Sequence, residues 1–208
     1  VLIKSIRIPS ELIELKEGWC NDTSKLTKIV VSKKNPRYCS YENKMIIGKT
    51  NIEQNNYDCL VFCVRDIQHI KIPNFIEHID PYSFDFCNKL ESIEFSDDSK
   101  LRTIGKYAFS KTSIKSIKLP SSVTFIGEGA FNSCFCLQQI EIPDDSKLKT
   151  IEKNAFTLTI IESFVIPSEL IELKECWCNC VRFKKISVSP KNPRYCCIDE
   201  KMIIGKSN

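Results

Sequence analysis

The sequence predicts an α/β solenoid, a right-handed coil in which each repeat adds one short strand to a parallel sheet. Three observations support this fold class. An apolar frame recurs along nearly all 208 residues, mostly at intervals of 22 to 24. Frame positions spaced by two are rich in Ile and Val, which favours strands. A small residue followed by an aromatic one closes most repeats, as expected where backbones pack closely. A fixed period of this kind indicates a repeat architecture.

Two columns of the frame define the coils. The column that aligns the strands consists of Ile6, Ile29, Ile70, Ile93, Ile117, Ile140, Phe164 and Ile186. The aromatic column consists of Trp19, Phe84, Phe109, Phe131, Phe156 and Trp177. We expect the segment around each aromatic residue to form a short helical turn. About eight coils, with strands stacked about 4.8 Å apart, would make a rod roughly 35–40 Å long.

The arc that follows each strand has two lengths. In four coils nine residues separate the strand column from the Ile or Leu that precedes the aromatic residue, and a Pro such as Pro73 or Pro120 follows the strand. Two coils carry the insertion DDSKL, at residues 97–101 and 144–148, and their interval is eleven. Since Pro fixes φ and removes a hydrogen-bond donor, it ends a strand cleanly. Short and long arcs therefore alternate along the middle of the chain.

The sequence also contains a second, longer repeat that spans several coils. IPSELIELKE occurs at 8–17 and 166–175, and KMIIGK at 44–49 and 201–206. An insertion near residues 35–66 contains two strand-like stretches, 44–49 and 58–64, joined by a polar loop, which predicts a hairpin projecting from the rod. A second, truncated hairpin is expected near residues 192–208. We interpret the chain as one solenoid domain spanning residues 1–208 and as a fragment of a longer protein.

The repeat unit resembles the BspA-like, or Treponema-type, leucine-rich repeat family. The stretches that carry the resemblance are LESIEFSDDSKLRTIGKYAF at 90–109 and IKSIKLPSSVTFIGEGAF at 114–131. The family's interruption after an NPxY-like segment is matched by Asn35–Tyr38 and Asn192–Tyr195. The resemblance implies a bacterial or parasitic-protist surface antigen, on the cell surface or secreted, that adheres to host matrix or cell-surface proteins. It carries over no catalytic residue. The alternative is a cytoplasmic leucine-rich repeat scaffold or regulatory protein.

Composition and motifs argue against other function classes. The net charge of +4 arises from 30 basic and 26 acidic residues mixed along the chain, which disfavours a nucleic-acid partner. No apolar run approaches the length of a membrane helix, so membrane contact by this segment is not expected. Gly48-Lys49-Thr50 and Gly205-Lys206-Ser207 lack the earlier Gly of a phosphate-binding loop. We expect no enzyme activity, no cofactor and no metal.

The 12 cysteines are interpreted mainly as small packed apolar residues. Cys-x-Cys at 134–136 and Cys-x-Cys-x-Cys at 176–180 lack the paired spacing of structural zinc sites. Cys87, Cys134 and Cys180 occupy every second coil, beyond the roughly 7 Å Cα separation that a disulfide tolerates, so they should not pair with one another. Cys39, Cys59 and Cys63 share the hairpin and could pair there.

Side chains between the inward columns should line the concave strand face and offer an extended protein-binding surface. The candidate binding residues are Arg7, Lys28, His69, Lys71, Glu94, Lys115, Lys118, Gln139, Glu141 and Lys184. The sign of the charge alternates between neighbouring coils. Attraction across adjacent strands explains much of this alternation, and we favour it over a dedicated site for a charged ligand.

Overall fold

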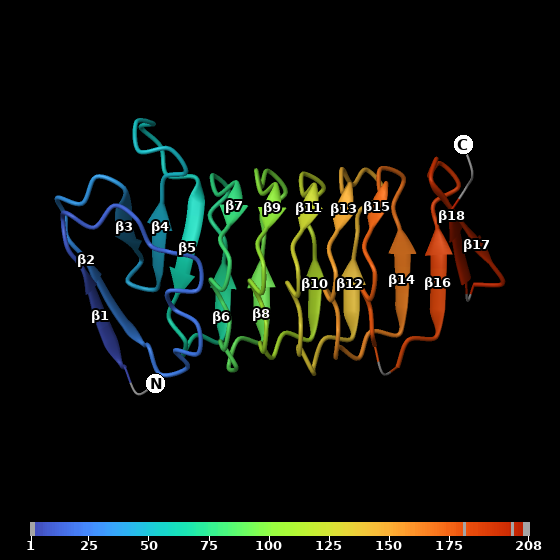
Figure 1. Cartoon of the computed structure of the whole chain (residues 1–208), viewed down its shortest axis with the longest axis horizontal. Helices are drawn as coiled ribbons and strands as arrows, with labels where there is room; N and C mark the ends of the chain where they lie inside the picture. The colour runs from blue at the N-terminus through green and yellow to red at the C-terminus, as the bar shows by residue number, and fades with distance from the viewer. Residues whose placement is uncertain (1–2, 181, 201, 206–208) are drawn as a thin grey trace.

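The computed structural model describes residues 3–180, 182–200 and 202–205, and shows an elongated solenoid built from strands and turns (Figure 1). The predicted parallel solenoid is correct, but the described residues contain no helix, so the α component of the prediction is wrong. The strands are β1 (Ser5–Ile8), β2 (Lys28–Val31), β3 (Tyr38–Tyr41), β4 (Met45–Gly48), β5 (Cys59–Cys63), β6 (His69–Lys71), β7 (His78–Ile79), β8 (Ser92–Glu94), β9 (Thr103–Ile104), β10 (Ser116–Lys118), β11 (Phe125–Ile126), β12 (Gln139–Glu141), β13 (Thr150–Ile151), β14 (Ser163–Ile166), β15 (Glu172–Leu173), β16 (Lys185–Val188), β17 (Tyr195–Ile198) and β18 (Met202–Gly205).

One row of strands follows the predicted column. β1 pairs with β2, β6 with β8, β10 with β12 and β14 with β16, all in parallel. Ile70 lies opposite Ile93, and Ile117 lies opposite Ile140, so the column residues are in register. Most of these column residues are buried, because they point into the coil. Figure 1 shows the row along the lower half of the solenoid.

Each central coil also carries a second strand that the sequence did not predict. The two-residue strands β7, β9, β11, β13 and β15 pair in parallel and form one sheet with the hairpin strands, in the order β15-β13-β11-β9-β7-β5-β4-β3. Their apolar residues are the frame Ile or Leu that precedes each aromatic residue, for example Ile104 opposite Ile126. The solenoid therefore has two strand rows facing one core.

The arcs around the aromatic column are turns that bond to neighbouring coils. Each central arc has two residues at positive φ, as at Tyr107 and Lys111, and such residues interrupt helical hydrogen bonding. The amide of Phe109 donates to the carbonyl of Ala130 in the next coil, at 2.8 Å. This bonding between coils explains why the predicted helical turn does not form.

The aromatic column forms the centre of the core. Phe84, Phe109, Phe131 and Phe156 stack in sequence, with ring centroids 4.9, 5.3 and 5.3 Å apart and interplanar angles of 16°, 11° and 9°. All four side chains are fully buried. Trp177 continues the column edge-on to Phe156, with centroids 6.2 Å apart. The stacked rings therefore pack each of these coils against the next one.

The hairpin strands β4 and β5 fall on the two stretches that the sequence predicted, but they do not project from the rod. Both strands are entirely buried and extend the eight-stranded sheet, because β5 pairs antiparallel with β4 and parallel with β7. β3 is a third strand that was not predicted. Only the connection between β4 and β5 extends beyond the sheet (Figure 1).

A buried arginine fastens this insertion to the coils. Arg65 is 1% exposed, and its guanidinium donates to the carbonyls of Ser83 and Tyr82 at 2.8 and 3.2 Å. The same group lies 4.3 Å from the ring centroid of Phe62 in β5. Since Nη1 and Nη2 donate to carbonyls and the charge meets an aromatic face, the burial of this cation is partly offset, although its Nε has no hydrogen-bond partner among the described residues.

The cysteines depart from prediction at one place. Cys178 and Cys180 form a disulfide, so Cys180 is not the simple packed thiol that was expected. Cys87 and Cys134 are buried free thiols, and none of the three residues is bonded to another of the three. Cys39, Cys59 and Cys63, which could have paired within the hairpin, are also free.

Candidate protein-binding face

The predicted binding residues all lie on the solvent side of the first strand row or directly beside it. In β6 and β10 the middle residue is buried and its two neighbours are exposed, so every coil presents outward side chains on both sides of the column. All ten candidates are exposed, including Arg7 and Lys28 near β1 and β2, and Lys184 near β16. The alternation of the strands thus creates an outward face that is mostly polar, with Val30 and Val165 as exposed apolar exceptions.

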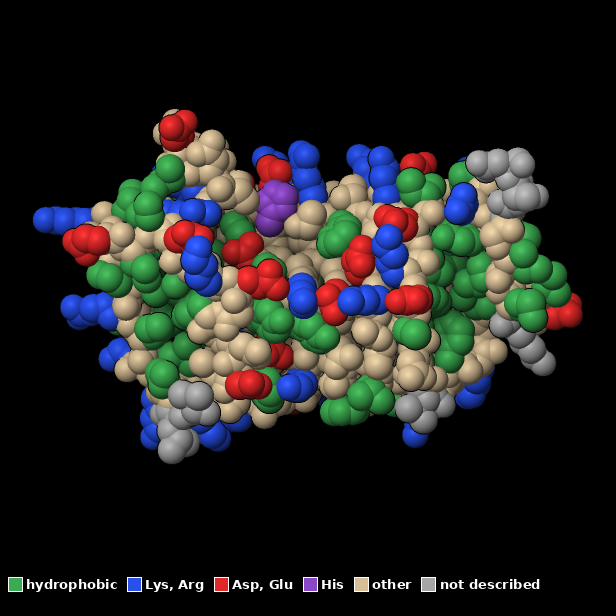
Figure 2. Space-filling view, viewed as in Figure 1, with side chains coloured by type: hydrophobic (Ala, Val, Ile, Leu, Met, Phe, Trp, Pro, Cys, Tyr) green, Lys and Arg blue, Asp and Glu red, His purple; other side chains and the backbone are tan. Residues whose placement is uncertain are grey.

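Ion pairs between neighbouring coils use part of this face. Lys115 lies 2.9 Å from Glu91, Lys118 lies 3.3 Å from Glu141, and Lys184 lies 3.1 Å from Glu162. The hydrogen bond and charge of Lys115 lower the pKa of the Glu91 carboxyl. Figure 2 shows alternating acidic and basic side chains across the middle of this side of the molecule. Cross-strand attraction therefore accounts for four of the ten predicted candidates, namely Lys115, Lys118, Glu141 and Lys184.

The other charged candidates are not neutralised in this way. Within the part of the chain that the structure describes, Arg7, Lys28 and Lys71 have no carboxylate within ion-pair distance. His69 contacts the hydroxyl of Ser92 through Nδ1 at 2.7 Å. Glu94 lies opposite Lys71 in the ladder without reaching it as an ion pair. Arg7, Lys28, Lys71 and Glu94 are therefore exposed charged residues without an ion-pair partner among the described residues.

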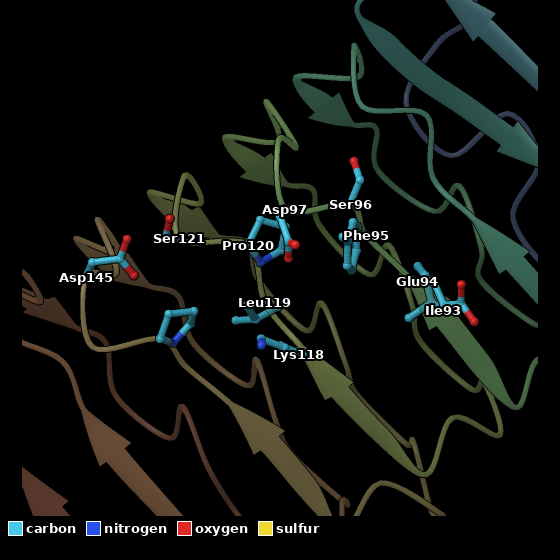
Figure 3. A pocket seen from close by; sticks show the side chains of 11 residues that line it. Ile93, Glu94, Phe95, Ser96, Asp97, Lys118, Leu119, Pro120, Ser121 and Asp145 are labelled. Atoms are coloured by element: carbon cyan, nitrogen blue, oxygen red, sulfur yellow. The ribbon is translucent and has the colours of Figure 1, made fainter.

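A hollow of about 530 Å³ lies where the strand row meets a short arc. Its floor includes Leu119 and Pro120, and Phe95 lines one side (Figure 3). Asp97 and Asp145 belong to the two DDSK segments on the flanking coils. The nine-residue arc is two residues shorter than its neighbours, so the flanking loops form walls around it. Glu94 and Lys118 from the predicted set also line this hollow.

A second hollow of about 470 Å³ occurs two coils earlier. Lys71, Ile72, Pro73 and Asp98 line it, and each has a counterpart 47 residues later in the first hollow. His69 also belongs to its lining. Two coils correspond to about 10 Å along the rod. Sequence reasoning missed these hollows as sites, although the alternation of nine- and eleven-residue arcs was the signal that locates them.

A third cavity, of about 410 Å³, lies between the first coil and the hairpin, and several of its polar groups already have partners within the chain. The Cys59 thiol donates to the Asp80 carboxylate at 2.6 Å, and burial raises the pKa of both groups. Arg37 donates through Nε to the carbonyl of Lys49 at 3.1 Å and through Nη1 to that of Ile13 at 3.1 Å. These contacts tie the hairpin to the first coil.

Comparison with known families decides the identity of the repeat. The model of the BspA type leucine rich repeat region matches residues 50–184 with six copies. The chain belongs to this BspA-type leucine-rich repeat family. The hollows and the strand face therefore lie on a fold whose members repeat the same coil many times.

Solved structures agree with the fold of the BspA-type repeats. The pneumococcal vaccine antigen PcpA is 18% identical with a TM-score of 0.68, over 82% of this chain and 54% of PcpA. A leucine-rich cell surface protein from Faecalibacterium prausnitzii A2-165 is 17% identical with a TM-score of 0.53, over 82% of this chain and 56% of that protein. This chain thus spans about half the length of each. A search of curated protein sequences finds no significant match.

The described residues contain neither a metal-binding cluster nor a candidate membrane-spanning helix. In residues 3–180, 182–200 and 202–205, no three His, Cys, Asp or Glu side chains are grouped so that they could hold a metal ion. In the same residues no helix has the length and apolar character needed to cross a bilayer. Of the Gly-Lys-Ser stretch at 205–207, Lys206 and Ser207 lie outside the described residues.

Proposed function

We propose that this chain is a non-enzymatic recognition and adhesion module that binds a protein ligand along its first strand row. The observation that carries the proposal is the pair of equivalent hollows two coils apart. They are lined by His69 and Lys71 in one case and by Glu94 and Lys118 in the other, which are four of the residues chosen from the sequence. Repetition of the same hollow suits a ligand that is itself extended.

The shape and chemistry of the hollows support a polypeptide ligand. Each has an apolar floor and a charged rim, the combination found at protein interfaces and ligand clefts. Their spacing of about 10 Å corresponds to one three-residue turn of a polyproline II helix, which rises about 3.1 Å per residue. A peptide in that conformation that crosses the coils could therefore place every third side chain in a hollow, while Arg7, Lys28, Lys115, Gln139, Glu141 and Lys184 contact it along the face.

We place the module at the cell surface or in a secreted protein, with a host matrix or cell-surface protein as ligand. The pneumococcal protein is described as a vaccine antigen and the Faecalibacterium protein as a cell surface protein. The Cys178–Cys180 disulfide is compatible with an oxidising compartment. Ten cysteines are free, which supports the alternative of an intracellular scaffold. Mass spectrometry of free thiols in native material separates the two locations.

Charge-swap variants test the face without changing net charge. The face variant combines Lys71→Glu with Glu94→Lys and Lys118→Glu with Glu141→Lys, so each cross-strand pair keeps its attraction while its polarity toward a ligand reverses. The control variant swaps Glu172 with Lys174 and Glu77 with Arg102, which are ion pairs in or beside the other strand row. Binding to immobilised extracellular-matrix proteins is measured by interferometry.

We expect the wild-type chain and the control to bind at least one matrix protein equally, and the face variant to bind it about tenfold or more weakly, a loss of about 1.4 kcal/mol. Circular dichroism should show the same thermal transition for all three proteins. Equal binding by the face variant would place the ligand elsewhere. Absence of binding to the whole panel by the wild type would contradict the matrix ligand.

A further inference from the structure

A basic hollow of about 430 Å³ lies where the arcs enter β9 and β11, in the middle of the rod (Figure 1). None of the candidate residues of the strand face lines it. Its lining consists of three cations and three hydroxyl residues, namely Lys100, Arg102, Lys147, Ser99, Ser122 and Thr124. We propose that this hollow binds a short sulfated segment of an extracellular polysaccharide through both its sulfate groups and its sugar hydroxyls.

The alternation of side chains in three consecutive arcs builds the site. Leu101, Val123 and Leu148 occupy equivalent positions in these arcs, and each is at most 1% exposed. Because side chains alternate along an extended segment, the residues on either side of each buried one point outward. They are Lys100 and Arg102 in the first arc, Ser122 and Thr124 in the second, and Lys147 and Lys149 in the third. Two pairs of cations therefore flank one pair of hydroxyls.

Backbone hydrogen bonds hold the three arcs in register. The amide of Thr124 donates to the carbonyl of Arg102 at 2.8 Å, and the amide of Lys149 donates to the carbonyl of Thr124 at 2.9 Å. Adjacent strands lie about 4.8 Å apart, so the backbones that carry the two pairs of cations are about 10 Å apart. The shorter hydroxyl side chains between them leave room for a ligand that contacts both pairs.

The two lysines of the hollow are not neutralised within the described residues. Neither Lys100 nor Lys147 forms an ion pair there. Arg102 lies 3.1 Å from Glu77 through Nε, and its side chain is 64% exposed. An anion that binds between the lysines therefore does not have to displace a carboxylate from either one. Charge complementarity favours an anionic ligand at this place.

Acidic residues limit the length of the site along the rod. Glu77 occupies the position of Arg102 in the preceding arc, since the amide of Arg102 donates to its carbonyl at 2.8 Å. On the other side, an adjoining hollow of about 460 Å³ shares Lys147 but also contains Asp145 and Glu169. A long polyanion that followed the rod would meet these carboxylates. The surface therefore fits a short segment with closely spaced anionic groups.

The hydroxyls of the middle arc favour a sugar over a simple anion. The hydroxyl of Ser122 donates to the carbonyls of Ser99 and Leu101 at 2.9 and 2.7 Å. That of Thr124 donates to the carbonyl of Arg102 at 3.2 Å. Each hydroxyl hydrogen is thus used within the chain, while each oxygen can still accept a hydrogen bond. A sulfate group has no hydrogen to donate to these oxygens, whereas a sugar hydroxyl has one.

The lining also disfavours a nucleic acid as the polyanion. The described residues that line the hollow include no aromatic side chain. Sites for single-stranded nucleic acids combine positive charge with aromatic side chains on which the bases stack. Cations and hydroxyl acceptors without such a stacking surface match a sulfated sugar better.

Binding of a fluorescent heparin oligosaccharide to the 208-residue chain, measured by anisotropy, tests the site. The hollow variant combines Lys100→Gln with Lys147→Gln. Its matched control combines Lys33→Gln with Lys34→Gln, which removes the same charge from exposed lysines outside the hollow. We expect saturable binding by the wild type, a loss of about tenfold or more in the hollow variant, and wild-type affinity in the control. All three proteins should share one thermal transition by circular dichroism.

A second variant tests the recognition of the sugar. Thr124→Val keeps the shape of the side chain and removes the hydroxyl acceptor. It should weaken binding of the oligosaccharide several-fold and leave the affinity for inorganic sulfate, measured by competition, unchanged. Equal effects on both ligands, or no effect on either, would contradict the role given to the hydroxyl and with it the choice of a sugar.

The remaining outcomes bear on the ligand class and on the strand face. Absence of saturable binding by the wild type, or equal losses in the hollow variant and its control, would overturn the site. Equal affinity for a desulfated oligosaccharide, or for a single-stranded oligodeoxynucleotide, would overturn the ligand class. The face variant of the strand row leaves every cation of the hollow in place and should bind the oligosaccharide like the wild type. Failure of the protein-binding proposal is therefore distinguishable from failure of this one.

Discussion

The two copies of the hairpin compare one local sequence in two environments. β3–β4 and β17–β18 have the same antiparallel register, from Tyr38 opposite Gly48 to Tyr195 opposite Gly205. Their turns contain Glu-Asn and Asp-Glu, yet all four residues have φ between 50° and 55°. β4 is buried throughout, while β18 is mostly exposed. Local sequence therefore determines strand and turn, and the neighbouring strand determines burial.

The largest difference between the copies should appear at their methionines. Met45→Ala should lower the free energy of unfolding by about 2–5 kcal/mol, because it leaves a cavity in the core. Met202→Ala should change it by no more than about 0.5 kcal/mol, because Met202 is largely exposed. Urea unfolding followed by circular dichroism measures both. Equal losses would contradict the difference in burial between β4 and β18.

The two hairpins share an asparagine, Asn35 or Asn192, that makes the same four hydrogen bonds in each copy. Asn35 donates to the carbonyls of Pro9 and Leu12 at 2.7 and 2.8 Å and accepts from the amides of Arg37 and Tyr38 at 3.0 and 2.7 Å. Asn192 makes the equivalent four bonds at 2.7, 2.8, 2.8 and 2.7 Å. Each asparagine fastens its hairpin to the arc of the preceding coil.

Asn35→Ala and Asn192→Ala should each cost about 1–3 kcal/mol, because buried carbonyls and amides lose their partners. Hydrogen exchange should locate the loss of protection around β3 in the first variant and around β17 in the second, since solenoids open locally. The Asp variants are informative controls, because a carboxylate keeps the acceptor and loses the donor. Global loss of protection in the second variant would contradict local fastening.

The sequence predicted the column residues, the aromatic ladder and the two hairpin strands because these depend on local periodicity. It did not predict β7, β9, β11, β13 and β15, because two-residue strands have no period of their own and form only by pairing between coils. The helical turn was predicted from a small residue beside an aromatic one, and this pattern proved compatible with a non-helical turn. The residues at positive φ, such as Tyr107 and Ser133, carry no side-chain signal for that conformation.

The candidate site was also predicted only in part, because only its strand residues follow a local sequence pattern. Alternation along a strand is enough to identify outward residues such as Lys71 and Lys118, and all ten candidates are exposed. The hollows depend on the relative length of adjacent arcs and on side chains from three coils, including Asp97 and Asp145. The disulfide between Cys178 and Cys180 was missed because Cys180 was interpreted as a small packed apolar residue. Whether the face binds a protein stays a prediction.

The smallest expected difference between the copies concerns Cys39 and Cys196, which occupy equivalent positions in β3 and β17. Burial raises the pKa of the Cys39 thiol, although a hydrogen bond with Tyr57 opposes the shift. Since the thiolate is the reactive form, Cys39 should react slowly at pH 8. The segment that carries Tyr57 lies beyond β4 and has no counterpart beside β18 in the described residues.

We therefore expect iodoacetamide to modify Cys196 several-fold faster than Cys39 at pH 8, as measured by peptide mass spectrometry. The difference should shrink as the pH rises, because a growing fraction of Cys39 becomes thiolate. Denaturation in urea should equalise the two rates, and the exposed thiol of Cys176 serves as an internal reference. Faster modification of Cys39 would mean that the insertion leaves β3 exposed to solvent. The first hairpin would then not be more buried than the second, contrary to this comparison.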